Sequence, residues 1–220
     1  MSAHSIGLED RLQTYLVHVG VREHDVLQRC RLETAQRDDA NMQISQEQGQ
    51  FLRILVELLG PHRIVEVGTF TGYSALAMAL SLPHEGSLIC CDICPEKTSH
   101  ARRYWQQAGV EHRIDLRLGD AIDTLDQMLS SGHAGTIDLM FVDADKESYS
   151  AYIDRAFALL RTNGLLLLDN VLWSGAVIDD TDQEPATRGI RAANLALAHD
   201  ERFTVCMIPL GDGLTLARKR

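Results

Sequence analysis

Apolar residues change their spacing along this chain near residue 60. Before that point they fall at i, i+3, i+4, i+7 and i+8 on one helical face, made by Phe51, Ile54, Leu55, Leu58 and Leu59. The run Ser-Gln-Glu-Gln at 45–48 fits a capping box at the start of this helix, and Gly60-Pro61 ends it. Residues 1–40 mix charged and apolar positions at helical spacing. We therefore expect one or two further amphipathic helices there.

From residue 61 onward, short apolar runs alternate with helix-like stretches. Five runs have the length and composition of buried strands: 64–67, 88–91, 114–118, 138–142 and 164–168. Helix-like stretches separate them, and this alternation predicts right-handed βαβ units around a parallel sheet.

The last two apolar runs, 203–208 and 214–217, are joined by a short connection that contains Gly-Asp-Gly at 211–213. Such a connection cannot hold a crossover helix, so these strands are expected to form an antiparallel hairpin at the sheet edge. The predicted fold is α/β: a doubly wound, mostly parallel seven-stranded sheet with its last strand reversed. A chain of 220 residues with 45% apolar content suits a single domain, with accessory helices in 1–60 and the α/β core in 61–220.

Composition limits the partners of the chain. No stretch approaches the roughly 18–20 unbroken apolar residues that a membrane helix requires, and the N-terminus has no apolar signal core. We therefore expect a cytoplasmic protein without a membrane partner. The net charge of −10 opposes binding to a polyanion, although charge alone does not exclude a structured RNA substrate.

A glycine-containing loop follows the first strand of the sheet, where doubly wound folds bind ligands. It reads Glu-Val-Gly-Thr-Phe-Thr-Gly-Tyr-Ser at 66–74. Gly68 and Gly72 permit a tight turn and close approach of a ligand to the backbone, but their spacing is not that of a dinucleotide-binding loop. The carboxylate of Glu66 would repel a pyrophosphate and attract a cofactor that carries an amine and a sulfonium.

Acidic residues also follow the second and third strands. Asp92 lies 24 residues beyond Gly68, where an acidic side chain can accept bonds from both ribose hydroxyls. Its alternative interpretation is a turn residue or helix cap before Pro95. Asp120 and Ala121 end the third strand's run and could border an adenine.

Oxygen-bearing side chains follow two later strands. Phe-Val-Asp-Ala-Asp-Lys at 141–146 and Leu-Asp-Asn at 168–170 come directly after apolar runs, so adjacent strand ends would bring Asp143, Asp169 and Asn170 together. Oxygen ligands select Mg²⁺, Ca²⁺ or Mn²⁺ over softer metals. A cation there would lower the pKa of a bound hydroxyl and prepare a nucleophile.

Lys146, three residues past Asp143, is near enough to remove or hold the proton of that hydroxyl. A lysine beside a divalent cation is expected to have its ammonium form disfavoured, as a general base requires. The alternative interpretation is that the polar residues of 143–146 cap the helix that follows.

These motifs together resemble the cation-dependent O-methyltransferases of the caffeoyl-CoA and catechol O-methyltransferase type. The resemblance covers nearly the whole chain: 42–45, 47–50, 66–74, 92–93, 108–110, 141–146, 169–175 and 207–214. It implies a class I methyltransferase fold of Rossmann-like type, an enzyme that uses S-adenosylmethionine and Mg²⁺, with Ca²⁺ or Mn²⁺ as alternatives, and a homodimer.

The resemblance also assigns residues. The positions that match its cofactor contacts are Met42, Glu66, Gly68, Thr69, Ser74, Asp92, Ala121 and Asp145. Asp143, Asp169 and Asn170 match its metal ligands, and Lys146 matches its proposed base. Methyl transfer would then be an in-line attack by the acceptor oxygen on the sulfonium methyl, with Asp143 and Lys146 as the catalytic residues.

One region departs from the family pattern. Plant caffeoyl-CoA enzymes carry an arginine and tyrosines for coenzyme A in the helix before the final hairpin, whereas residues 186–194 here read Ala-Thr-Arg-Gly-Ile-Arg-Ala-Ala-Asn. The chain thus resembles the bacterial branch, and a coenzyme A thioester is not the expected acceptor. Trp173 is expected to wall the acceptor pocket, with simple packing as the equal alternative.

The leading hypothesis is a divalent-metal-dependent O-methyltransferase that acts on a small catechol-like or other vicinal hydroxylated molecule. A second hypothesis keeps the fold and cofactor but takes a hydroxylated tRNA base as acceptor. A third, from another class, is a nucleotide-binding oxidoreductase, against which the Glu66 carboxylate and the glycine spacing argue. The last is a binding protein that has lost catalysis, against which the complete set of polar site residues argues.

Overall fold

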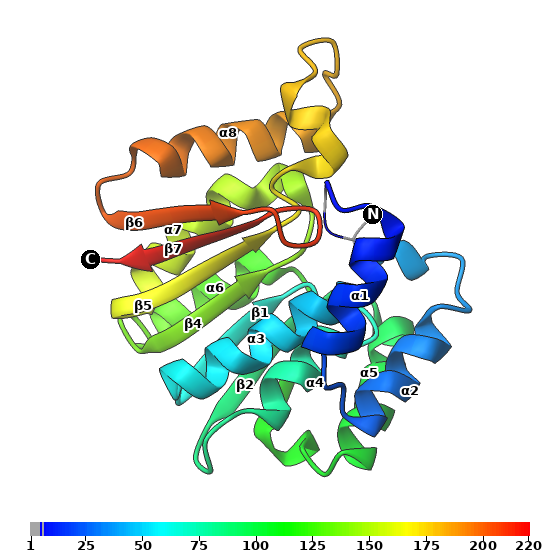
Figure 1. The fold of residues 1–220 in the computed structure, drawn as a ribbon. Helices are drawn as coiled ribbons and strands as arrows, with labels where there is room; N and C mark the ends of the chain where they lie inside the picture. The colour runs from blue at the N-terminus through cyan, green and yellow to red at the C-terminus, as the bar shows by residue number, and fades with distance from the viewer. Residues whose placement is uncertain (1–4, 6) are drawn as a thin grey trace.

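A computed structural model describes Ser5 and residues 7–220, which wind around one seven-stranded sheet (Figure 1). The strand order is β3-β2-β1-β4-β5-β7-β6. The strands are β1 Arg63–Val67, β2 Ser87–Asp92, β3 Ile114–Leu118, β4 Ile137–Val142, β5 Leu160–Asp169, β6 Phe203–Ile208 and β7 Leu214–Lys219. β1 to β5 run parallel, and β7 runs antiparallel to both β5 and β6. The predicted doubly wound sheet with its last strand reversed is confirmed.

Helices cover both faces of the sheet. The first layer holds α1 Asp10–Gly20, α2 Asp25–Thr34, α3 Gln46–Leu59, α4 Tyr73–Leu80 and α5 Pro95–Gln107. The second holds α6 Ala121–Ser130, α7 Tyr149–Leu159 and α8 Pro185–His199. Short 3₁₀ turns are η1 Ala40–Met42, η2 Glu111–Arg113, η3 Lys146–Ser148 and η4 Trp173–Ile178. In the described part of the chain, no helix combines the length and apolar character needed to cross a membrane.

The alternation of side chains along each strand divides the core into two parts. In β4, Leu139 and Phe141 belong to the cluster that packs against α3 and α4. Met140 and Val142 belong to the cluster that packs against α6 and α7. Figure 1 shows α3 in front of the sheet and α7 behind it. Because helices cover both faces, the sequences of the central strands are continuous apolar runs.

The helix predicted before the sheet forms as α3. Its start is capped by Ser45, whose Oγ accepts from the Gln48 N–H at 3.3 Å, and it ends at Gly60 with φ of 54°. The predicted capping box is only half formed, because the fully buried Gln48 side chain makes no return bond to Ser45.

The N-terminal helices are fastened to the core through buried polar contacts. Glu23, just before α2, accepts from Arg31 at 2.8 Å and from the Tyr73 hydroxyl of α4 at 2.7 Å. Thr34 at the end of α2 donates to Thr71 in the loop after β1 at 2.9 Å. These contacts place the following segment, which includes Met42, against the carboxyl ends of the strands.

The predicted division of the single domain into accessory helices (1–60) and an α/β core (61–220) stays a prediction, and so does the homodimer.

Gly68 lies where the ends of β1, β2 and β4 converge. Its N–H donates to the carbonyl of Cys91 at 3.0 Å. Its φ is +90°, and a Cβ at this position would lie 1.9 Å from the carbonyl oxygen of Asp143. Only glycine therefore permits this approach of the two strand ends.

Gly68→Ala is expected to reduce the free energy of unfolding by at least about 2 kcal/mol, because it adds both backbone strain and a clash with fixed backbone. Gly109→Ala is the matched control, since Gly109 also has positive φ (+71°) but no heavy atom lies within 4 Å of its added Cβ. That variant is expected to lose about 1 kcal/mol. Urea denaturation followed by circular dichroism measures both, and equal losses would contradict the clash.

Candidate active site

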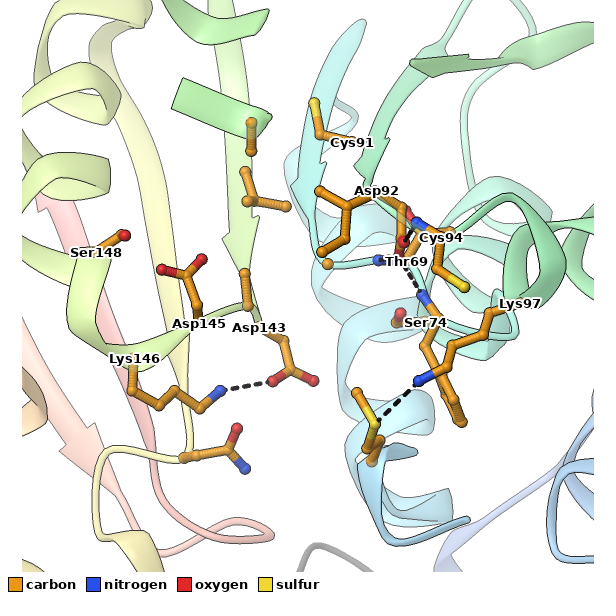
Figure 2. Close-up of a pocket in the computed structure, with 18 of the residues that line it drawn as sticks. Thr69, Ser74, Cys91, Asp92, Cys94, Lys97, Asp143, Asp145, Lys146 and Ser148 are labelled. Carbon is orange, nitrogen blue, oxygen red and sulfur yellow. Dashed lines mark hydrogen bonds and ion pairs between the residues drawn. The ribbon is translucent and has the colours of Figure 1, made fainter. Parts of the chain in front are cut away.

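A cavity of about 770 Å³ opens at the carboxyl ends of β1, β2 and β4 (Figure 2). The predicted site residues that line it are Met42, Gly68, Thr69, Ser74, Asp92, Ala121, Asp143, Asp145, Lys146, Asn170 and Trp173. The two others, Glu66 and Asp169, have no exposed surface and lie in the strands behind the cavity wall. The predicted residues are thus brought to one place.

Asp92 at the end of β2 organises the loop after β1. Its Oδ2 accepts from the N–H groups of Thr69 and Phe70 at 2.9 and 2.8 Å, and its Oδ1 accepts from Cys94 N–H at 2.7 Å. The alternative interpretation of Asp92, a turn residue before Pro95, is therefore partly correct. A carboxylate offers about four acceptor sites, so Asp92 keeps capacity for a ligand hydroxyl at the cavity.

Glu66 is a buried carboxyl group beside the cavity. Burial raises its pKa from 4.5 to about 8, although hydrogen bonds from Ser74, Cys90 and Thr69 oppose this shift. Its Oε1 has no hydrogen-bond partner among the described residues. A buried acceptor of this kind is costly unless a donor or a positive charge meets it, so the position fits a ligand that carries an amine.

The ends of β4 and β5 bring two carboxylates together. Val142 pairs with Leu168 in the sheet, so Asp143 and Asp169 leave adjacent strands at the same level. Burial and the negative charge of Asp143 raise the pKa of Asp169. Asp169 Oδ1 accepts from the Asn170 N–H at 2.8 Å, while its buried Oδ2 meets no hydrogen-bond donor in the described part of the chain.

This donor set fits a hard cation, because crowded buried carboxylates are stabilised by a positive charge. The set consists of two carboxylates and the Asn170 amide. Within residue 5 and residues 7–220, no group of three or more His, Cys, Asp or Glu side chains is arranged to hold a metal ion. The predicted metal site therefore depends on the amide as its third ligand.

Lys146 reaches into the same place. Figure 2 shows its side chain directed at Asp143, and Nζ lies 3.0 Å from Asp143 Oδ1. Burial lowers the Lys146 pKa, but the Asp143 carboxylate and the Tyr149 hydroxyl raise it more, so the net shift is upward. The expected disfavouring of the ammonium concerns a lysine beside a divalent cation, and it stays a prediction.

Asp145 does not join the carboxylate pair. Its carboxylate points away from that of Asp143 in Figure 2, and its Oδ1 accepts from the Tyr152 hydroxyl at 2.6 Å. Tyr152 also lines the cavity. Sequence reasoning missed Tyr152, although it follows Asp145 by two helical turns and that spacing could have marked it.

Tyr149 is a second aromatic residue that sequence reasoning missed. Its fully buried hydroxyl accepts from Lys146 Nζ at 2.9 Å and donates to the Asp169 carbonyl at 2.8 Å. Tyr149 thus connects the lysine after β4 to the strand end that carries Asp169. An aromatic residue at the start of a helix otherwise resembles ordinary core packing, so the sequence contained no separate signal for it.

Trp173 forms one wall of the cavity in an unusual backbone conformation. Trp173, Ser174 and Gly175 all have positive φ, at 48°, 51° and 88°. Asp212 from the loop between β6 and β7 holds this turn, since its Oδ1 accepts from Ser174 N–H at 2.5 Å and its carbonyl accepts from Leu172 N–H at 3.0 Å. Lys146 Nζ lies 5.8 Å from the centre of the Trp173 ring, which favours the pocket-wall interpretation.

The segment that contains η1 closes another side of the cavity. Residues 41–44 line it, and Lys97 of α5 lies 2.9 Å from Asp39 and 3.6 Å from the Met42 sulfur. The Lys97 ammonium also lies over the Phe70 ring, 5.1 Å from its centre. Lys97 and Phe70 were not predicted, because neither belongs to a polar cluster at a strand end.

At the opposite side, Ala121 begins α6. Asp120 caps that helix by accepting from the Ile122 and Asp123 N–H groups at 2.7 and 3.4 Å. Both residues line the cavity together with Gly119. The side of the cavity at β3 thus consists of Gly119, the capping residue Asp120, and the small residue Ala121.

A doubly wound sheet with a glycine turn after β1 and acidic residues after β2, β4 and β5 defines a class I methyltransferase. A sequence model of the O-methyltransferase family matches residues 17–220. The chain belongs to this family, and it is an S-adenosylmethionine-dependent O-methyltransferase of the caffeoyl-CoA and catechol type. The oxidoreductase hypothesis is wrong.

Individual relatives extend over the same length. The chain is 40% identical to mouse catechol O-methyltransferase domain-containing protein 1 over 211 residues, which are 96% of this chain and 80% of that protein. It is 39% identical to caffeoyl-CoA O-methyltransferase 2 of Populus trichocarpa, over 96% of this chain and 89% of that protein. The crystal structure of an O-methyltransferase from Bacillus cereus in complex with SAH is similar with a TM-score of 0.84 and 29% identity, over 94% of this chain and 96% of that one.

The buried Glu66 carboxyl makes stability depend on pH. Its folded pKa of about 8 exceeds its ordinary value of 4.5, so between these values the folded state binds more protons and loses stability as pH rises. Glu66→Gln removes this loss. From pH 5 to pH 8 the ligand-free variant is expected to gain at least about 2 kcal/mol relative to the wild type.

Urea denaturation at pH 5, 6.5 and 8 measures this difference. Glu201→Gln, at an exposed carboxylate, is the control and is expected to follow the wild type at each pH. A Glu66→Gln difference that stays constant with pH would contradict a raised pKa for Glu66.

Proposed function

We propose that this protein is a Mg²⁺-dependent O-methyltransferase whose acceptor is a small molecule with two adjacent hydroxyls. The observation that carries the proposal is the pair formed by Asp143, which lines the cavity, and the fully buried Asp169 behind it, whose Oδ2 has no hydrogen-bond partner in the described residues. The relatives named for catechol and caffeoyl-CoA substrates support the acceptor chemistry. The metal and the acceptor are the proposed parts, since the family itself requires only the methyl transfer.

Asp143, Asp169 and Asn170 would hold the cation, and a bound cation supplies a positive charge that lowers the pKa of an adjacent hydroxyl. The chain itself fixes the geometry of these ligands. Asp169 is oriented by the Asn170 N–H through the 2.8 Å bond to Oδ1. The Tyr149 hydroxyl donates a hydrogen bond to the backbone carbonyl of Asp169 and so fixes its main chain.

Lys146 is the residue proposed to hold the proton that leaves the acceptor. Its Nζ lies between Asp143 Oδ1 and the Tyr149 hydroxyl, at 3.0 and 2.9 Å. The Asp143 carboxylate is the main contact that raises the Lys146 pKa against the effect of burial. Once that carboxylate is neutralised, the ammonium is less favoured and Nζ can accept a proton.

The other predicted residues would hold S-adenosylmethionine, which supplies the electrophilic methyl carbon. Glu66 would meet its amine, Asp92 its ribose hydroxyls, and Ala121 its adenine. Asp145, fixed by Tyr152, adds a second carboxylate on the cofactor side. Met42, with Gly68, Thr69 and Ser74, would complete the enclosure, which orients the methyl and excludes water.

The size and charge of the cavity support a small acceptor. Ligand pockets commonly span about 300–1,000 Å³, and the single volume of about 770 Å³ must hold the cofactor as well. On the acceptor side it is bordered by Trp173 and Ala186, and Lys146 is the basic residue near them. This composition suits a neutral catechol ring better than the phosphates of coenzyme A.

Removal of divalent metal is expected to abolish methyl transfer to catechol, and Mg²⁺ is expected to restore it. Asp169→Asn should lower Mg²⁺ affinity by at least about tenfold, since it removes one of two ligand charges. Isothermal titration calorimetry measures this affinity independently of turnover. Asp154→Asn, at an exposed carboxylate on α7, is the control, and full turnover by the wild type in EDTA would overturn the metal dependence.

An acceptor screen with labelled S-adenosylmethionine and Mg²⁺ is expected to show methylation of catechols and little of monophenols, because a single hydroxyl cannot offer two adjacent oxygens to the metal site. The screen should include flavonoids, hydroxycinnamoyl-CoA esters and unmodified tRNA. Preferential labelling of tRNA would favour the second hypothesis, and preference for the CoA ester would contradict the proposed small acceptor.

A further inference from the structure

One wall of the cavity is continuous with an irregular segment that has little core of its own. This segment runs from the end of β5 at Asp169 to the start of α8 at Pro185 and includes η4. None of the residues of η4 is buried, and Ile178 is 86% exposed. The cavity is lined near one end of the segment by Trp173, and just beyond its other end by Ala186 of α8. Its shape must therefore come from contacts other than apolar packing.

Arg191 of α8 supplies those contacts. Its Nε donates to the Val177 carbonyl at 3.0 Å and its Nη1 to the Asp182 carbonyl at 2.7 Å. Its Nη2 donates to the Ala176 carbonyl at 2.8 Å and also to the carbonyl of Asp179. One planar guanidinium thus holds four backbone acceptors of the segment 176–182.

These bonds reach the backbone and not the side chains of the segment. The Asp179 carboxylate accepts instead from Thr181, at 2.9 Å from its N–H and 2.7 Å from its Oγ1. The Asp182 carboxylate accepts from the Glu184 N–H at 2.9 Å. Arg191 therefore fixes the path of the chain and makes no bond to the side chains of 176–182.

α8 is itself fixed against the proposed catalytic residues. A Cβ added at Gly189 would lie 2.4 Å from the Lys146 carbonyl oxygen, so the helix touches η3 backbone to backbone. One turn past Gly189, Asn194 Nδ2 donates to the Val171 carbonyl at 2.8 Å, next to Asn170. α8 thereby relates the segment 176–182 to Lys146 and to the end of β5.

We propose that Arg191 is a positioning residue: by holding the segment 176–182, it fixes the places of Trp173 and Ala186, the two cavity-lining residues on either side of that segment, and so determines which acceptors fit. The acceptor part of this inference rests on the proposed function. Because four of the five guanidinium N–H groups are engaged with backbone, Arg191 is not available to bind an anionic acceptor.

Limited proteolysis with endoproteinase Asp-N tests the clamp without any substrate. The segment carries Asp179, Asp180 and Asp182, and mass spectrometry identifies cleavage at these positions. Arg191→Met is expected to raise the cleavage rate there by at least about tenfold, because several charged hydrogen bonds that oppose opening are lost. Arg191→Lys should give an intermediate rate, since one ammonium cannot reach four carbonyls.

Arg188→Met is the matched control, because Arg188 is an exposed arginine on the same helix and does not line the cavity. It is expected to be cleaved at the wild-type rate. Cleavage of Arg191→Met at 178–182 as slow as in the wild type would overturn the clamp. Circular dichroism excludes general unfolding, since a folded variant keeps the wild-type spectrum.

Steady-state kinetics with catechol and calorimetry with SAH test the effect on acceptor selection. Arg191→Met is expected to raise KM for catechol about tenfold while the Kd for SAH stays within about twofold, with Arg191→Lys between. An equal loss of SAH binding would show general loosening and overturn the positioning role. If the wild type itself does not methylate catechol, the proposed function fails, whereas the proteolysis result still decides whether Arg191 holds the segment.

Discussion

The electrostatic conflict between Asp143 and Asp169 is the constraint on which the rest of the site depends. The register of β4 and β5 brings the two residues to adjacent strand ends, where burial deprives Asp169 of water and Asp143 adds a like charge. The Lys146 ammonium partly compensates this charge through its 3.0 Å contact with Asp143. A protein that needed only stability would have no reason to keep such a pair at a cavity. The arrangement is understandable if a cation takes over the compensation and releases the lysine.

The same sheet separates two kinds of carboxylate that lie close in the sequence. Asp143 faces Lys146, whereas Asp145 faces Tyr152 and points elsewhere in Figure 2. On the opposite side of the cavity, the Asp92 carboxylate accepts hydrogen bonds from the backbone of the loop after Gly68. The same carboxylate lines the cavity, so it both orders this turn and borders the space for a ligand. The cavity thus has a side suited to a nucleoside and an amine and a side suited to a cation and an acceptor. The transferred methyl would lie where the two sides meet, which is the geometric requirement for in-line attack.

Much of the sheet and of the site could be predicted from the sequence, because buried parallel strands appear in it as continuous apolar runs. Apolar runs marked the strands closely, and polar clusters after them marked the site, since all parallel strands end at one edge. β5 begins at Leu160, earlier than its apolar run, because Leu160 pairs with Ile137 of β4 ahead of the polar residues 161–163, where the register is irregular. Tyr149, Lys97 and Asp212 were not predicted. Each acts through a contact with a segment far away in the chain, and no local pattern records such a contact.

The acceptor side of the cavity was the hardest part of the site to predict from the sequence. It is also the part that we propose selects the acceptor. The cofactor side is built from strand ends and glycine turns, whose positions follow from the sheet and leave little freedom. The acceptor wall is held by contacts of an irregular segment: Asp212 binds the backbone N–H groups of Leu172 and Ser174, and Arg191 binds backbone carbonyls in 176–182. A clamp that binds backbone imposes one path on many possible side-chain sequences. Changes within 176–182 could therefore shift Trp173 and Ala186, which line the cavity on either side of it, without changing Lys146 or the carboxylate pair. Under this proposal, the segment between β5 and α8 selects the acceptor, and the residues after β4 and β5 catalyse the transfer. Helix α8 contacts both.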